Sequence, residues 1–178
     1  MSDKTDNQVV LVLVVSLVLV AAFVACDILL EKTPMIEYQY GQKINEIRIA
    51  KNFWLNEFQS HKDETVKIDP QLVIGLQKLR DVIHAPIVIT SGYREKKCTS
   101  YHYHGMAADF KSPNYSMEEL FKWAVAIPEF KGIGLYDDHI HVDTRHQEDK
   151  LYWTCIEGEY KYFYEWEEAL EYYQSQQA

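Results

Sequence analysis

Residues 132–143 read GIGLYDDHIHVD, and this stretch decides much of the fold. In its second half His139, His141 and Asp143 alternate with an isoleucine and a valine. Side chains two residues apart on a strand share a face, so the polar set can point to one side of a sheet while the apolar pair faces a core. We therefore predict strand structure over this stretch, with a turn or bend near Asp137-Asp138.

The sequence before this stretch predicts further strands and a long helix. A second alternating run, Met106–Lys111, separates Asp109 from its apolar neighbours, and the β-branched run Pro86–Thr90 is bounded by proline and by Ser-Gly. Asp69-Pro70 is a favoured helix start, because aspartate caps the helix and proline suits its first turn. Apolar residues then recur at helical spacing up to His84.

A second helix and the order of the elements set the fold class. The helix opens at a capping box, Ser116 with Glu119 three residues on, and ends before Pro128. The order helix, strand, strand, helix, strands predicts an α+β domain with helices packed on a small, mainly antiparallel sheet. From Glu157 the chain is acidic and aromatic, and near-helical spacing up to Tyr173 predicts a packing helix. A helix that contacts a partner or a cell wall is the alternative.

The N-terminal segment predicts a membrane span. Residues 9–26 read VVLVLVVSLVLVAAFVAC, with no charge and only Ser16 as a polar interruption. As a helix they would be roughly 27 Å long, close to the thickness of a bilayer core. A helix that is apolar on every face suits lipid better than a domain core. We expect an uncleaved anchor, with a cleaved signal peptide or a lipobox ending at Cys26 as alternatives.

The composition limits the partners and the metal ligands. Lys and Arg total 18 against 27 Asp and Glu, a formal net charge of -9, which leaves no basic stripe for phosphate contacts. We therefore expect no nucleic-acid partner. Cys26, Cys98 and Cys155 are not spaced as a zinc knuckle, so a metal must use other ligands. We expect Cys98 to be an inert thiol, with a reactive thiol or a disulfide to Cys155 as alternatives.

Histidines and aspartates gather in two short clusters. His102 and His104 precede Asp109, and His139 and His141 lie in the stretch quoted above. A catalytic zinc takes about three nitrogen or oxygen ligands from the protein and leaves a position for water, which two histidines and one carboxylate allow. The bound water would then act as a hydrolytic nucleophile. A single His-x-His pair more often has a structural role, so the chemistry depends on the two clusters together.

Three motifs together resemble the signatures of zinc D-Ala-D-Ala peptidases, the VanY-like enzymes of the Hedgehog/DD-peptidase superfamily. They are SGYR at residues 91–94, SxHxxGxAxD at residues 100–109 and DHxH at residues 138–141. The similarity runs from about Phe53 to Arg145. It implies a Hedgehog/DD-peptidase-like α+β fold.

The resemblance also implies a role for each residue of the centre. Zinc would be held by His102, Asp109 and His141. Asp138 would be the general base. His139 would stabilise the tetrahedral intermediate and help the proton reach the leaving amine.

Further roles implied by the resemblance concern the substrate. Arg94 would grip a substrate carboxylate or the developing oxyanion, with Tyr93 beside it in the substrate-binding set. Ser100 would orient the loop that carries His102, with a plain turn role as its alternative. His104 stands where the family usually has an apolar residue, and we expect it to be an exposed neighbour rather than an alternative ligand.

The implied activity is zinc-dependent hydrolysis of peptidoglycan stem peptides, by a D-Ala-D-Ala carboxypeptidase or endopeptidase. Alternatives are a phage endolysin-like endopeptidase and a non-catalytic wall-binding or assembly protein that keeps the fold. The chain would divide into an anchor or signal segment (1–30), a connector (31–50), the peptidase domain (51–150) and a C-terminal extension (151–178). We expect a membrane-anchored, extracytoplasmic domain, or a secreted one if the N-terminal segment is cleaved.

Overall fold

The computed structural model describes residues 36–38, 45–95 and 100–177. Met35–Ala178 form one compact unit. Within the described ranges, no helix is both long enough and apolar enough to span a membrane. The membrane segment predicted at residues 9–26 lies outside the described residues, so it stays a prediction.

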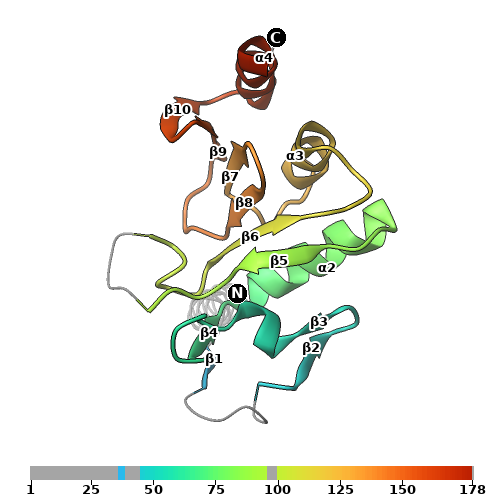
Figure 1. The fold of residues 1–178 in the computed structure, drawn as a ribbon, viewed down its shortest axis with the longest axis vertical. Coiled ribbons are helices and arrows are strands. Elements are labelled where there is room, and N and C mark those ends of the chain that lie inside the picture. The colour runs from blue at the N-terminus through green and yellow to red at the C-terminus, as the bar shows by residue number, and fades with distance from the viewer. Residues whose placement is uncertain (1–35, 39–44, 96–99, 178) are drawn as a thin grey trace, which may run out of the picture. The chain divides into compact units, whose positions relative to one another are not determined.

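A six-stranded sheet is the centre of the fold (Figure 1). Its order is β10-β9-β7-β8-β6-β5, and every neighbouring pair is antiparallel except β7 with β9. The predicted α+β class with a mainly antiparallel sheet is confirmed. The strands are β5 (Val88–Ser91), β6 (Ala107–Lys111), β7 (Gly132–Tyr136), β8 (Ile140–Asp143), β9 (Leu151–Ile156) and β10 (Glu159–Phe163).

Two small antiparallel pairs precede this sheet in the chain. They join β1 (Ile36–Tyr38) to β4 (Val66–Ile68) and β2 (Arg48–Ala50) to β3 (Phe53–Trp54). A short 3-10 helix, η1 (Leu55–Phe58), follows β3 and contacts β4 and β5. These elements therefore link the N-terminal part of the domain to the edge of the main sheet.

Helices α2 and α3 begin where their capping residues predict. In α2 (Pro70–Ile83) the carboxylate of Asp69 accepts a hydrogen bond from the backbone N–H of Gln71, at 3.0 Å. In α3 (Met117–Val125) Ser116 and Glu119 form the predicted reciprocal capping box. α3 contacts β7 and β8.

The C-terminal region differs from the predicted helix. Residues Glu159–Phe163 form β10, paired with β9, and helix α4 begins only at Trp166 and runs to Gln177. The reason is the turn at Glu157-Gly158, where both residues have positive φ, 50° and 85°. A two-residue turn with this backbone twist matches the twist of paired strands and therefore folds the chain back as a hairpin. Residues 151–163 thus complete the same sheet that carries β6 and β8.

The two faces of the sheet have different surroundings. Ile140 and Val142 of β8 have no exposed surface and belong to the core cluster, as do Ala108 and Phe110 of β6. The residues that alternate with them along the two strands, which include Asp109, point to the other face of the sheet. The alternation predicted from the sequence is therefore confirmed, and the polar face is left for the functional site.

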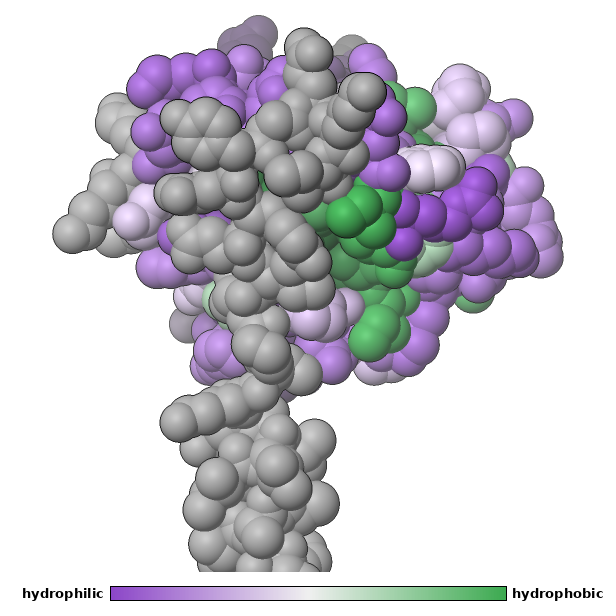
Figure 2. Space-filling model, turned by 90° about the horizontal axis from the view of Figure 1, so that it is seen from below, coloured by the Kyte–Doolittle hydropathy of each residue, from purple (hydrophilic) through white to green (hydrophobic). Residues whose placement is uncertain are grey.

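Another part of the surface carries exposed apolar side chains. On the face that Figure 2 shows, a hydrophobic patch lies beside hydrophilic residues. Among the described residues, large apolar side chains that are more than a third exposed include Ile47, Trp54, Ile74 and Val82. Single exposed apolar residues are normal on a folded domain, so these residues carry no functional argument by themselves.

Two buried threonines provide a matched test of how the fold is held together. The Thr144 hydroxyl donates to the capping carboxylate of Asp69 and so joins the end of β8 to the start of α2. The Thr154 hydroxyl is buried without a hydrogen-bond partner among the described residues. Thr144→Val should lower the free energy of unfolding by about 1–3 kcal/mol, because a buried acceptor loses its donor. Thr154→Val should not lower it. Urea denaturation of both variants decides this, and equal losses would contradict it.

Candidate metal centre

His102 lies in the turn that precedes β6 and is buried, with 2% exposure. Its Nδ1 lies 2.7 Å from the carbonyl oxygen of Gly92. A carbonyl oxygen only accepts, so Nδ1 donates and the neutral ring keeps its lone pair on Nε2. The backbone N–H of Arg94 donates to the carbonyl oxygen of His102, at 3.4 Å. The segment of Gly92 and Arg94 therefore fixes both the backbone and the ring of His102.

Asp109 and His141 face His102 from paired positions on two neighbouring strands. Asp109 of β6 is directly opposite His141 of β8. The Nε2 of His141 lies 3.4 Å from a carboxylate oxygen of Asp143, which can only accept. Its Nδ1 lies 2.8 Å from Asp109 Oδ1, which also only accepts, so Nδ1 can carry a hydrogen as well. When the cluster binds a cation, Nδ1 would give up that hydrogen, and Nε2 would keep its own toward Asp143.

Three atoms that can bind a metal ion meet at one buried point. His102 Nε2 lies 3.2 Å from both Asp109 Oδ1 and His141 Nδ1, and these last two atoms are 2.8 Å apart. Within the described residues this is the cluster of three that could hold a metal ion. Acceptor atoms this close repel one another unless positive charge lies among them, and two imidazoles with one carboxylate are a ligand set that zinc accepts. The residues present therefore fit the implied zinc.

The charge states of the cluster follow from its burial and its contacts. Burial opposes ionisation of Asp109, but its contacts with His102 and His141 hold its pKa well below its usual range. Burial also opposes a charge on His141, yet hydrogen bonds to Asp109 and Asp143 raise its pKa above the ordinary value. Asp109 is therefore a carboxylate anion, and a divalent cation that binds beside it would displace the proton from His141 Nδ1.

Asp143 and Arg145 support the cluster from behind His141, and the sequence interpretation gave neither of them a role at the site. Asp143 has no exposed surface and accepts two hydrogen bonds from the guanidinium of Arg145, at 2.7 and 2.6 Å. Burial would raise the pKa of Asp143, but Arg145 and His141 lower it to about 2. Alternation on β8 already placed Asp143 on the face of His141, so the spacing could have indicated this support.

Arg94 contacts the second oxygen of the Asp109 carboxylate. Its guanidinium forms an ion pair with Asp109 Oδ2, and its Nε donates to the Ser91 hydroxyl, at 2.9 Å. Half of the Arg94 side chain remains exposed, at 49%. The structure therefore places Arg94 at the rim of the cluster, between a ligand residue and solvent.

Asp138 and His139 lie at the bend between β7 and β8. Asp138 is 86% exposed, and its carboxylate lies 2.6 Å from Nδ1 of His139. The other ring nitrogen, Nε2, is 3.8 Å from Asp109 Oδ1, and Tyr136 stacks on the ring with centroids 4.2 Å apart. His139 therefore lies between Asp138 and the cluster, with Nε2 on the side of the metal ligands.

The remaining predicted site residues lie around the His102 loop. Ser100 Oγ accepts from the backbone N–H of His102, at 3.3 Å, which fits an orienting role. Tyr93 is buried and stacks on Tyr103, with ring centroids 6.5 Å apart. His104 is exposed and contacts Tyr103, outside the three-residue cluster.

The comparison with known proteins decides the family. The family model described as Peptidase M15 matches residues 43–143, which is more than half of the chain and includes all three cluster residues. The chain belongs to the Peptidase M15 family. This is the family of the zinc D-Ala-D-Ala carboxypeptidases that the three motifs resemble. No curated protein matches the chain.

Two cavities adjoin the M15 metal centre from opposite sides. One, of about 620 Å³, is lined by Arg94 and Ser91 together with His61 and Lys62. The other, of about 410 Å³, is lined by His141 and by aromatic side chains of β9 and β10. The centre therefore lies where a chain-like substrate could reach it from either side.

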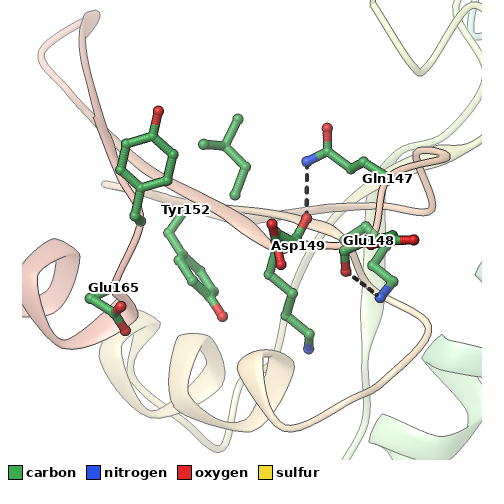
Figure 3. Close-up of a pocket in the computed structure, with 9 residues that line it drawn as sticks. Gln147, Glu148, Asp149, Tyr152 and Glu165 are labelled. Atoms are coloured by element: carbon green, nitrogen blue, oxygen red, sulfur yellow. Dashed lines mark hydrogen bonds between the residues drawn. The ribbon is translucent and has the colours of Figure 1, made fainter.

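A larger cavity, of about 760 Å³, lies away from the M15 cluster and includes none of the predicted site residues. The Lys150 amine at its wall donates to the carbonyl oxygens of Val125 and Ile127, at 2.6 and 2.7 Å. This contact satisfies carbonyl groups at the end of α3, so it has a structural explanation. Figure 3 shows the labelled lining residues Gln147, Glu148, Asp149, Tyr152 and Glu165.

The support from Asp143 can be tested through metal affinity. Asp143→Asn keeps the size of the side chain but removes the charge that orients His141, so zinc affinity should fall by roughly 10–100-fold. Competition with a coloured chelator measures this. The exposed Asp149 offers a matched control, since Asp149→Asn should leave the affinity within about twofold. Equal zinc affinities of the Asp143→Asn variant and the unchanged protein would contradict the assignment.

Proposed function

We propose that this M15 family member is a zinc-dependent peptidase that hydrolyses peptidoglycan stem peptides. The observation that carries the proposal is the buried convergence of His102 Nε2, Asp109 Oδ1 and His141 Nδ1. Arg94 and His139 at its rim add groups that bind anions and transfer protons. A non-catalytic protein of this fold would not need all of these groups together.

The ligand residues are oriented before a metal arrives. Gly92 holds the His102 ring, Asp143 holds the His141 ring, and Arg94 holds the outer oxygen of Asp109. A zinc ion bound there would act as a Lewis acid that activates water and polarises the scissile carbonyl. The protein atoms need little rearrangement to bind it, because each ring is already fixed by its second nitrogen.

The geometry favours His139 as the group that moves the proton. Nδ1 of His139 donates to the Asp138 carboxylate, so the neutral ring presents a basic Nε2 on the side of the cluster. We propose that this atom accepts a proton from the attacking water and returns it to the leaving amine. Asp138 then acts as a positioning residue that stabilises the protonated ring. Direct proton transfer to Asp138, as the motif implies, is the alternative.

Arg94 is proposed to bind the substrate carboxylate. Its half-exposed guanidinium lies beside the cluster, in the cavity that also contains His61 and Lys62. Lys62 in this cavity is paired with Glu95, so the Arg94 guanidinium, which also contacts Asp109, is the charged group that a C-terminal carboxylate would meet. A guanidinium can hold a carboxylate with two hydrogen bonds. In this binding orientation, the C-terminal residue of a stem peptide would lie next to Arg94.

The proposed substrate implies a location outside the cytoplasmic membrane. Peptidoglycan lies there, and the apolar residues 9–26 are proposed as the anchor that holds the domain beside it. Fractionation of cells that produce the full chain tests this. The unprocessed chain in the soluble fraction would contradict the anchor without affecting the peptidase proposal.

Digestion of purified muropeptides tests the activity. Full-length protein with one equivalent of zinc should release D-alanine or cut a cross-link, and mass spectrometry separates these products. Removal of zinc with a chelator should abolish the reaction, and His102→Ala should lower zinc binding and hydrolysis together, because a ligand is lost. A zinc-loaded protein with correct stoichiometry and no product from either substrate would overturn the proposal.

Turnover measurements on two variants distinguish the roles of Asp138 and His139. If His139 Nε2 moves the proton, His139→Gln should lower kcat by roughly 10²–10⁴-fold, and Asp138→Asn should lower it less, because the ring keeps its lone pair. Zinc content should persist in both variants. If Asp138 is the base, the order of the two losses is reversed. Undiminished turnover of a zinc-loaded His139→Gln variant would remove His139 from the mechanism.

A further inference from the structure

One row of paired residues crosses the whole sheet and contains two of the three proposed metal ligands, Asp109 and His141. Directly paired residues on neighbouring strands point to the same face, so the members of such a row lie side by side. We call this set the site row. From β5 to β10 it consists of Ser91, Asp109, His141, Gly134, Trp153 and Tyr162.

Glycine in this row brings an aromatic ring against the metal centre. A Cβ atom on Gly134 would lie 2.4 Å from Nε1 of Trp153, so only glycine leaves room for the indole there. The indole lies over β7 and comes within 5.1 Å of the His141 ring, measured between centroids. The aromatic part of the site row therefore begins directly at a proposed metal ligand.

From Trp153, contacts between aromatic rings lead to the edge of the sheet and then back toward the metal cluster. Trp153 is followed by Tyr162 at 6.3 Å, and Tyr162 by Tyr160 at 6.4 Å with ring planes only 19° apart. Tyr160 contacts Tyr136, which stacks on His139. Tyr136, Trp153, Tyr160 and Tyr162 form what we call the aromatic wall.

The aromatic wall belongs to a cavity with a distinct chemistry. Its volume is about 410 Å³, and Tyr101 and Arg145 also line it. The Arg145 guanidinium lies over the rings of Tyr101 and Trp153, 4.6 and 5.4 Å from their centroids. The Arg145 charge is already met by two hydrogen bonds to Asp143. None of the described lining residues is aliphatic. The cavity thus offers flat ring faces and hydroxyl groups, without a free charge among these residues.

Such a surface suits a neutral, hydroxylated ring. The C–H face of a pyranose packs on aromatic rings, and its hydroxyl and amide groups can bond to phenol oxygens. Tyr160 and Tyr162 are 55% and 62% exposed, so their rings are accessible at the edge of the sheet. An anionic ligand would find no unpaired cation here, and an aliphatic side chain would leave the phenol groups unmatched.

The position of the aromatic wall also fits the direction in which the proposed stem peptide would bind. Arg94 lies at the β5 end of the site row, where the free carboxylate would bind, and the wall lies at the opposite end. From His141 to Tyr162 the row crosses three strand spacings, about 14 Å. About four extended residues cover a similar distance, roughly 13 Å, and in a stem peptide they lead from the scissile bond to the sugar.

We propose that the aromatic wall is a sugar-binding subsite, which holds an N-acetylated amino sugar of the glycan to which the stem peptide is attached. The assignment of this sugar to peptidoglycan rests on the proposed function. β9 and β10 lie beyond residues 43–143, which the family model matches, so three of the four rings of the wall come from the C-terminal hairpin and only Tyr136 from the matched region. It would make the protein prefer peptides that are still linked to glycan.

Binding of a plain sugar tests the subsite without any hydrolysis. Full-length protein should bind a tetramer of N-acetylglucosamine, detected by calorimetry. Tyr162→Ala and Tyr160→Ala should each weaken binding roughly tenfold or more, because each removes a stacking face. Tyr164→Ala is the matched control, since Tyr164 is 85% exposed and does not line this cavity. Its affinity should stay within about twofold of the unchanged protein.

A second measurement connects the subsite to the substrate. The ratio of kcat/KM for a sugar-linked stem peptide to that for the free peptide should exceed one and should fall toward one in Tyr162→Ala. Sugar binding that depends on Tyr162, without hydrolysis of any peptide, would refute the peptidase proposal and leave the subsite standing. Hydrolysis with equal rates on both substrates and no tetramer binding would overturn the subsite alone. Equal, Tyr162-dependent binding of a sugar-free peptide would also overturn it.

Discussion

The structure depends on one electrostatic constraint, which is the close approach of three metal-binding atoms at a largely buried point. His102, Asp109 and His141 are each less than a tenth exposed. Their facing atoms repel unless positive charge lies among them, and burial strengthens this repulsion. The surrounding protein holds them there against that repulsion, through the Gly92 carbonyl and the Asp143 carboxylate. Because the cluster is energetically unfavourable without a cation, the binding of a cation stabilises it.

The fold supplies this constraint by simple means. Alternation on β6 and β8 gives each strand one apolar face for the core and one polar face for the site, so the residues that stabilise the sheet and those that bind metal do not compete for space. The pairing of Asp109 with His141 then fixes their separation. A slip of one residue by either strand would turn its ligand toward the core and its apolar side chains toward the site.

Much of this was predictable from the sequence, and the failures have physical reasons. Alternation around His141 and the caps at Asp69 and Ser116 are local signals, and they gave the strands and helices correctly. The hairpin after Glu157 was missed, because near-helical aromatic spacing outweighed a two-residue turn signal. The contact of Asp138 with His139 and the reach of Trp153 over Gly134 depend on side-chain directions and on strand order, which no local pattern contains.

The parallel pairing of β7 with β9 has a consequence for how the molecule opens. The chain leaves β8, crosses through residues 144–150 and returns beside β7, so β9 and β10 extend the sheet on the side of β7 that faces away from β8. The outer strand β10 is held on one side only, and edges of this kind exchange their amide hydrogens by local fraying at lower free energy than central strands. The proposed ligands Asp109 and His141 lie on inner strands, whereas Tyr160 and Tyr162 lie on the edge strand, where we expect fraying first. The domain thus combines a rigid reaction centre with an adaptable outer rim on the same sheet.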